Sequence, residues 1–66
     1  MPVINVTLTE IPLEQKRELI KRMTEVSMEI TGTPEHGNTV VITELPLSSF
    51  GIGKRSAADV FADKQK

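Results

Sequence analysis

The sequence predicts an α+β fold in which a long helix connects two strands and a short hairpin follows. Three observations support this prediction. Apolar residues alternate with polar ones near the amino terminus, recur every three or four residues in the middle of the chain, and form a β-branched run after a Gly- and Pro-containing loop. Strand, helix and strand in this order favour parallel pairing through a right-handed crossover. With 66 residues, positions 1–66 are expected to form a single domain.

The first strand is predicted over residues 2–9. Its apolar residues Ile4, Val6 and Leu8 occupy every second position, and polar Asn, Thr and Thr follow them in turn. Successive side chains of a strand point to opposite faces, so this strand has one apolar and one polar face.

The helix is predicted over residues 12–31. Pro12 is expected at the first helical position, where its missing N–H costs nothing, and Gly32 is expected as the left-handed cap at the end. Glu18 and Arg22 are spaced to form an i,i+4 ion pair. The apolar residues of one stripe are Leu13, Leu19, Ile20, Met23, Val26 and Ile30.

The second strand is predicted over residues 39–45, after a loop at 34–38 and before Pro46, which stops it. Its first half is apolar on both faces, as in a central strand. Residues 48–53 are predicted to form a glycine-bearing turn or short hairpin, and residues 54–66 a polar tail. The sheet face away from the helix is expected to carry Val and Ile that further copies of the chain cover.

Composition excludes several classes of site and partner. The chain has no cysteine and one histidine, His36, which is expected to be an ordinary loop residue, so no metal or other cofactor is expected. Nine acidic against eight basic residues give no basic footprint for nucleic acid. No apolar run is long enough to span a membrane and no secretory signal is recognisable, so the expected location is the cytoplasm. Because a chain of this size buries little surface, a homo-oligomer is expected.

Pro2 is the residue with the clearest chemical potential. Removal of Met1 would leave a free secondary amine at the start of a strand. The pKa of a free α-amine is about 8, and burial lowers the pKa of a cationic group. Such an amine is a competent general base and a nucleophile toward carbonyls. If Met1 is retained, the nitrogen is an amide and offers no base. The local pattern is also compatible with Pro2 as a plain strand starter.

Four short motifs in this order resemble the 4-oxalocrotonate tautomerase family over residues 2–53. They are Pro2 after Met1, Glu14-Gln15-Lys16 opening the helix, Ile42-Thr43-Glu44 in the second strand, and Phe50-Gly51-Ile52-Gly53. The resemblance implies a β-α-β protomer with a C-terminal hairpin, a four-stranded sheet in a dimer, and a hexamer. It implies an isomerase of 2-hydroxy-dienoates or other small 2-oxo acids, an anionic substrate, Pro2 as base and Phe50 as an apolar wall beside it.

Two positions depart from that family's pattern. The turn at residues 10–13 is one residue shorter and lacks the family's arginine, and Thr39 stands where a second arginine is expected. In the family these arginines bind the substrate's carboxylates and polarise its carbonyl. Lys54 and Arg55 follow the Phe50 turn and are candidate replacements, or else solvated tail charges. Basic residues on the helix of a neighbouring copy are further candidates, with a solvated helix face as the alternative: Lys16, Arg17, Lys21 and Arg22.

Two other functions remain open at this point. One is a related enzyme that hydrates, dehalogenates or decarboxylates a short unsaturated or oxo acid, with protonated Pro2 as acid. The other is a non-enzymatic oligomer that has lost its substrate clamp, which the two missing arginines favour.

Overall fold

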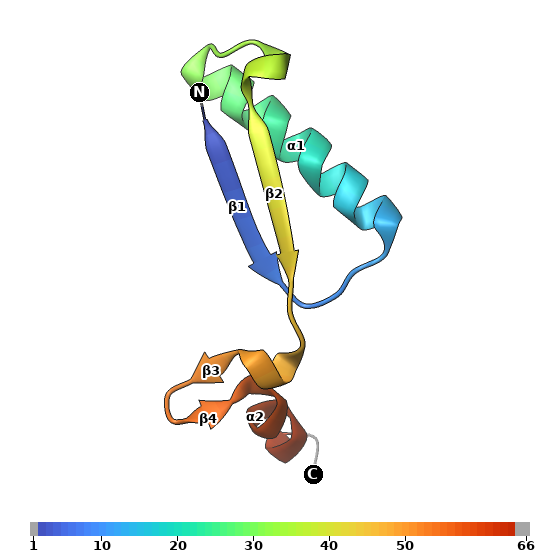
Figure 1. The fold of residues 1–66 in the computed structure, drawn as a ribbon, viewed down its shortest axis with the longest axis vertical. Coiled ribbons are helices and arrows are strands. Elements are labelled where there is room, and N and C mark those ends of the chain that lie inside the picture. The colour runs from blue at the N-terminus through green and yellow to red at the C-terminus, as the bar shows by residue number, and fades with distance from the viewer. Residues whose placement is uncertain (1, 65–66) are drawn as a thin grey trace.

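The computed structural model describes residues 2–64 and forms two parts joined end to end (Figure 1). The first part is a β-α-β unit, and the second is a short hairpin with a helix against it, which lies beyond the carboxyl ends of the first two strands. The molecule is elongated, with extents of 47 × 25 × 15 Å. In chain order the elements are β1 (Val3–Leu8), α1 (Leu13–Thr31), η1 (Glu35–Gly37), β2 (Thr39–Glu44), η2 (Leu47–Ser49), β3 (Gly51–Ile52), β4 (Arg55–Ser56) and α2 (Ala57–Lys64).

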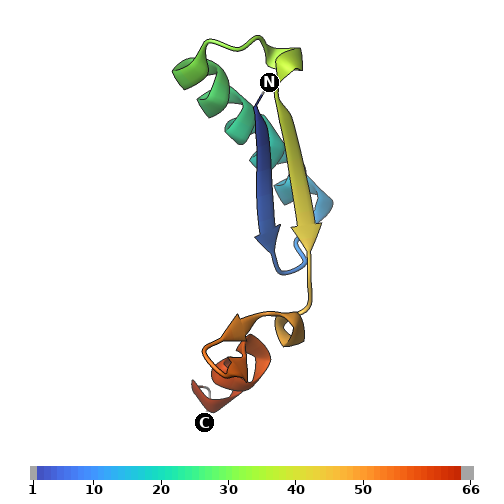
Figure 2. The same ribbon diagram turned by 60° about the vertical axis from the view of Figure 1, so that its left-hand side comes forward.

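The predicted α+β architecture is therefore confirmed, because β1 and β2 pair in parallel and α1 covers one face of the pair (Figure 2). The register places Val3 opposite Thr39, and the pairing continues to the end of both strands. Both strands are one or two residues shorter than predicted. Each follows a strict exposed/half-buried alternation along its six residues.

The distribution of apolar residues over the two sheet faces differs in one respect from the prediction. Ile4 and Ile42 are both half-buried and belong to the alternation set covered by α1. The open face carries Val3, 53% exposed, and Val41, 41% exposed, but no isoleucine. The period of two decides this, because both isoleucines occupy even positions of their strands.

Helix α1 begins one residue later than predicted. Pro12 is the N-cap and not the first helical residue, since its ψ of 152° is extended. Its carbonyl nevertheless starts the helix by accepting N–H bonds from Gln15 and Lys16, at 3.0 and 3.1 Å. At the other end Gly32 has the predicted left-handed conformation, with φ of 74°, and its N–H donates to the Met28 carbonyl.

The predicted polar tail contains a second helix, α2, so that prediction was wrong for residues 57–64. Ser56 precedes the helix, and its hydroxyl accepts the N–H of Asp59 at 3.2 Å. A serine followed three residues later by an acidic residue is a helix-start signal. The side chains of Ala57 and Phe61 then give the short helix an apolar side. The predicted hairpin is present but extends to residue 56, since Gly51 pairs with Ser56 and β4 lies in the predicted tail. Residues 65–66 lie outside the described residues.

A buried serine fixes the end of α1 to the loop that precedes β2. Ser27 is 9% exposed and donates its hydroxyl to Asn38 Oδ1 at 2.5 Å. Asn38 Nδ2 donates to the Pro34 carbonyl at 2.9 Å. These bonds set where β2 starts and therefore which residue lies beside the beginning of β1.

Glu44 ties the other end of the sheet to the turn that enters α1. Its carboxylate accepts the Ile11 N–H at 2.9 Å and pairs with Lys16 Nζ at 2.5 Å. The hydrogen bond from Lys16, followed by that from the Ile11 backbone, lowers the pKa of Glu44. The predicted Glu18–Arg22 pair is also present, at 2.7 Å, and lowers the pKa of Glu18.

The lowered pKa of Glu44 predicts how stability responds to acid. The folded state holds the ionised form more tightly, so this contribution is present above the unfolded pKa, about 4.3, and is lost as pH falls through the lower folded value. Glu44→Gln should destabilise the protein at pH 7 and make its stability decline less between pH 5 and pH 3. Urea unfolding at fixed protein concentration measures both effects. Glu29→Gln, at an exposed position on α1, is the control and should keep the parent's acid dependence; a Glu44→Gln curve parallel to the parent's would contradict the prediction.

Candidate functional site

Pro2 lies at the start of β1, beside the start of β2. Its side chain is half-buried, and its carbonyl accepts the Thr39 N–H at 3.0 Å. The parallel register brings these two residues together, because Val3 is opposite Thr39. Two of the predicted site residues are thus neighbours. Met1, on whose removal the free amine depends, lies outside the described residues.

Phe50 is at the opposite end of the sheet from Pro2 in the same chain. It follows η2, beyond the carboxyl ends of β1 and β2 (Figure 1). Six residues of strand at about 3.3 Å each separate the two ends by roughly 20 Å. One copy of the chain therefore cannot bring Phe50 into contact with its own Pro2.

An apolar hollow of about 290 Å³ surrounds Phe50. Leu8 and Thr9 form one wall of it, at the end of β1, and the hairpin and α2 form the other. Phe50 is half-buried, and its carbonyl accepts the Ala57 N–H at 2.7 Å, which fixes the residue to the start of α2. The lining residues are Leu8, Thr9, Leu47, Phe50, Gly51, Ile52, Ala57 and Phe61.

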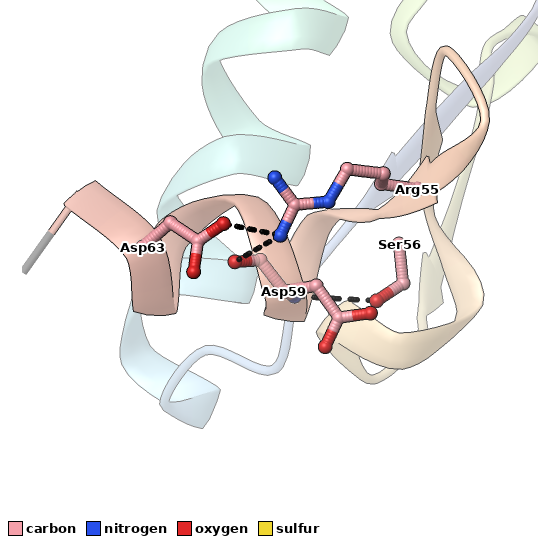
Figure 3. A network of polar contacts seen from close by, with 4 residues as sticks. All are labelled: Arg55, Ser56, Asp59 and Asp63. Carbon is pink, nitrogen blue, oxygen red and sulfur yellow. Dashed lines mark hydrogen bonds and ion pairs between the residues drawn. The ribbon is translucent and has the colours of Figure 1, made fainter.

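The two cations predicted to replace the family's arginines belong to the same C-terminal part as Phe50. Lys54 is exposed in the turn between β3 and β4 and has no ion pair with another described residue. Arg55, in β4, forms an ion pair with Asp63 of α2 (Figure 3). Both are far from the Pro2 of their own chain, at the end of the sheet where Phe50 lies.

The basic residues of α1 divide into paired and unpaired ones. Lys16 pairs with Glu44, and Arg22 pairs with Glu18 through Nε. Arg17 and Lys21 have no ion pair within the described part of the chain. The exposed-face alternative given for these four residues fits Arg17, Lys21 and Arg22, the last with a side chain 72% exposed, whereas the Lys16 side chain is only 31% exposed.

A second hollow among residues 2–64 is unsuited to an anionic substrate. It measures about 530 Å³ and includes none of the predicted site residues. Glu10 and Glu44 line it, and their charges would repel a carboxylate. Across residues 2–64, no group of three or more His, Cys, Asp or Glu side chains is placed to hold a metal ion, and no helix is both long and apolar enough to cross a membrane.

The β-α-β fold with its C-terminal hairpin is that of a tautomerase-type protein. A family model described as tautomerase enzyme matches residues 2–59. The chain belongs to the 4-oxalocrotonate tautomerase family, as its motifs predicted. No curated protein sequence shows significant similarity to it.

Three solved structures illustrate the similarity. TomN, a 4-oxalocrotonate tautomerase homologue in the tomaymycin biosynthetic pathway, is 32% identical with a TM-score of 0.88, over 92% of this chain and 95% of TomN. The apo unfused 4-oxalocrotonate tautomerase is 37% identical with a TM-score of 0.84, over 89% and 98% of the two chains. DmpI from Archaeoglobus fulgidus is 34% identical with a TM-score of 0.82, over 88% and 100%. These similarities support a tautomerase-type function.

Sequence reasoning missed the residues that surround Arg55. Asp59 and Asp63 are on α2, which was predicted to be part of a polar tail. The helix-start signal at Ser56 was available, and it would have placed two acidic residues one turn apart beside the hairpin. The Glu44–Lys16 pair was also missed, because its partners are 28 positions apart in the sequence and no local pattern links them.

Proposed function

We propose that this chain is a tautomerase of small 2-hydroxy-dienoate or 2-oxo acids, with Pro2 as general base after removal of Met1. The observation that carries the proposal is the position of Pro2, half-buried at the head of β1 in a chain of this family. A neutral secondary amine takes the proton of the enol oxygen and returns a proton to a carbon further along the conjugated system.

The proposed site is shared between copies of the chain. Pro2 and Phe50 are roughly 20 Å apart within one chain, since the whole length of β1 lies between them. If a second copy pairs beside the first in the opposite direction, the Phe50 end of one copy meets the Pro2 end of the other. The hollow at Phe50 then supplies an apolar wall that favours the neutral form of the amine. We propose such dimers as the units of a hexamer.

The substrate's carboxylate needs a cation at this shared site. An unpaired charge in a partly buried site is costly, so some basic group must meet it. Lys54 and Arg55 belong to the same C-terminal part as Phe50. A copy that places its Phe50 at a neighbour's Pro2 therefore places these two cations at the same end of the sheet. Thr39, beside Pro2, offers a hydroxyl that can accept or donate a hydrogen bond.

A non-enzymatic oligomer is the second candidate, and one specific observation favours it. The turn at residues 10–13 has no basic residue and Thr39 replaces the second arginine, so the family's usual electrophilic groups are missing. An enzyme that hydrates, dehalogenates or decarboxylates a short acid, with Pro2 protonated, would lack the same two arginines.

Mixing two impaired variants tests the shared site and the activity together. Pro2→Ala and Phe50→Ala should each lower the rate at which the protein ketonises phenylenolpyruvate. Mixed by unfolding and refolding, they should recover roughly a quarter of the parent activity, because half of randomly formed pairs are mixed and each has one intact site. Light scattering checks that each variant still assembles. If both variants match the parent rate, the tautomerase proposal fails. If both are impaired and mixing recovers nothing, the site is not shared between copies.

A further inference from the structure

Arg55 is held by α2 through a single nitrogen. Its Nη2 donates to Asp63 Oδ2 and, at 3.3 Å, to the carbonyl oxygen of Asp59 (Figure 3). An Nη atom carries two hydrogens. Nη2 is therefore engaged inside the chain by two acceptors, both of them on α2.

This arrangement limits how Arg55 can meet another carboxylate. A guanidinium binds a carboxylate most tightly in a fork, through two parallel N–H bonds. Only two edges present such a pair, Nη1 with Nη2 and Nε with Nη2, and both need Nη2. While Asp63 is in place, a second carboxylate must share Nη2 with Asp63 to form either fork.

Arg55 is also well placed with respect to Phe50. Arg55 is opposite Ile52 in the hairpin, and the next bond along the hairpin joins Ala57 N–H to the Phe50 carbonyl. Any copy of the chain that brings Phe50 to a neighbour's Pro2 brings Arg55 to the same end of the sheet.

We propose that Asp63 sets the specificity of the site by competing with the substrate's carboxylate for the fork of Arg55. This inference rests on the proposed function. It predicts that this protein prefers anionic over neutral enols less strongly than it would if Arg55 were not paired with Asp63. The side chains of Arg55 and Asp63 are 51% and 52% exposed. Exposed pairs are weak, so a substrate carboxylate can replace Asp63.

Kinetics on a matched pair of substrates test the inference. With phenylenolpyruvate, Asp63→Asn should lower KM about two- to fivefold, the range that the loss of an exposed ion pair allows, and leave kcat nearly unchanged. With the enol of the methyl ester, which has no carboxylate, the same variant should match the parent. Arg55→Ala should raise KM for phenylenolpyruvate about ten- to a hundredfold, the usual cost of one charge-assisted bond, and should abolish the effect of Asp63→Asn.

Two control variants separate this competition from general effects. Asp59→Asn removes the same charge one turn away on α2, but Arg55 bonds to the backbone carbonyl of Asp59, so its KM should equal the parent's. Asp63→Glu keeps a carboxylate on α2 and should restore much of the parent KM. Far-UV circular dichroism should show equal helix content in all four variants.

The outcomes distinguish this inference from the proposed function. If Asp63→Asn raises KM, Asp63 helps Arg55 to bind and the competition is refuted. If Arg55→Ala and Asp63→Asn both leave KM unchanged while Pro2→Ala lowers the rate, the inference fails and the proposed function stands. If Pro2→Ala also has no effect, the proposed function has failed.

Discussion

A chain that keeps one residue before Pro2 should have much lower tautomerase activity than the chain that begins at Pro2. We expect a loss of about a hundred- to ten-thousandfold, the usual contribution of general base catalysis. The extension converts the secondary amine into an amide, which has no basic lone pair. Pro2→Ala should lose less, because alanine keeps a terminal amine, although a primary amine is more basic and differently placed. Initial rates of phenylenolpyruvate ketonisation, with intact mass to confirm each amino terminus, measure both effects.

The structure gives a reason to expect that these two changes leave the fold intact. Pro2 precedes the first strand residue, and its backbone hydrogen bond to Thr39 uses the carbonyl, which both variants retain. Light scattering and circular dichroism should therefore match the parent. Equal rates for the parent and the extended chain would remove Pro2 from the mechanism and favour the non-enzymatic alternative.

Much of the β-α-β unit was predictable because its signals are local. The period-two pattern of β1, the apolar stripe of α1 and the glycine at its end each follow from residues within a few positions of one another. Gly32 confirms this, since it has the left-handed conformation that was predicted for the end of the helix. Pro12 was misplaced by one residue, because the same missing N–H is tolerated at the cap and at the first helical position.

The C-terminal part and the site were harder to predict for two different reasons. Helix α2 is short and depends on Ala57 packing against the hairpin, a tertiary contact that polar composition conceals. The adjacency of Pro2 and Thr39 follows from parallel pairing, but the separation of Pro2 from Phe50 follows from the direction in which the chain leaves β2. The engagement of Arg55 by Asp63 requires α2 to be present, so a prediction without that helix left Arg55 free.

The second large effect concerns assembly. Among residues 2–64, Ala57 is the one buried apolar residue, at 3% exposure, and no large side chain is fully buried. Several large apolar side chains remain exposed: Val3, Leu13, Ile20, Val26, Ile30, Val41, Leu47, Ile52 and Phe61. A single copy buries too little apolar surface to offset the entropy lost on folding. Further copies of the chain should therefore cover these residues.

Two of the exposed residues make a direct test of this expectation. Val26 and Ile30, 48% and 78% exposed, lie one turn apart on α1. Burying each in an interface is worth about 1.5–3 kcal/mol, so replacing both by lysine should split the assembly into smaller species and lower its stability. Glu25→Lys changes the net charge by the same amount on another side of α1 and should leave the assembly intact. Light scattering at micromolar concentration reports the mass of each variant. A parent protein that is a folded monomer, or a double variant with the parent's mass and stability, would show that α1 is not an interface between copies.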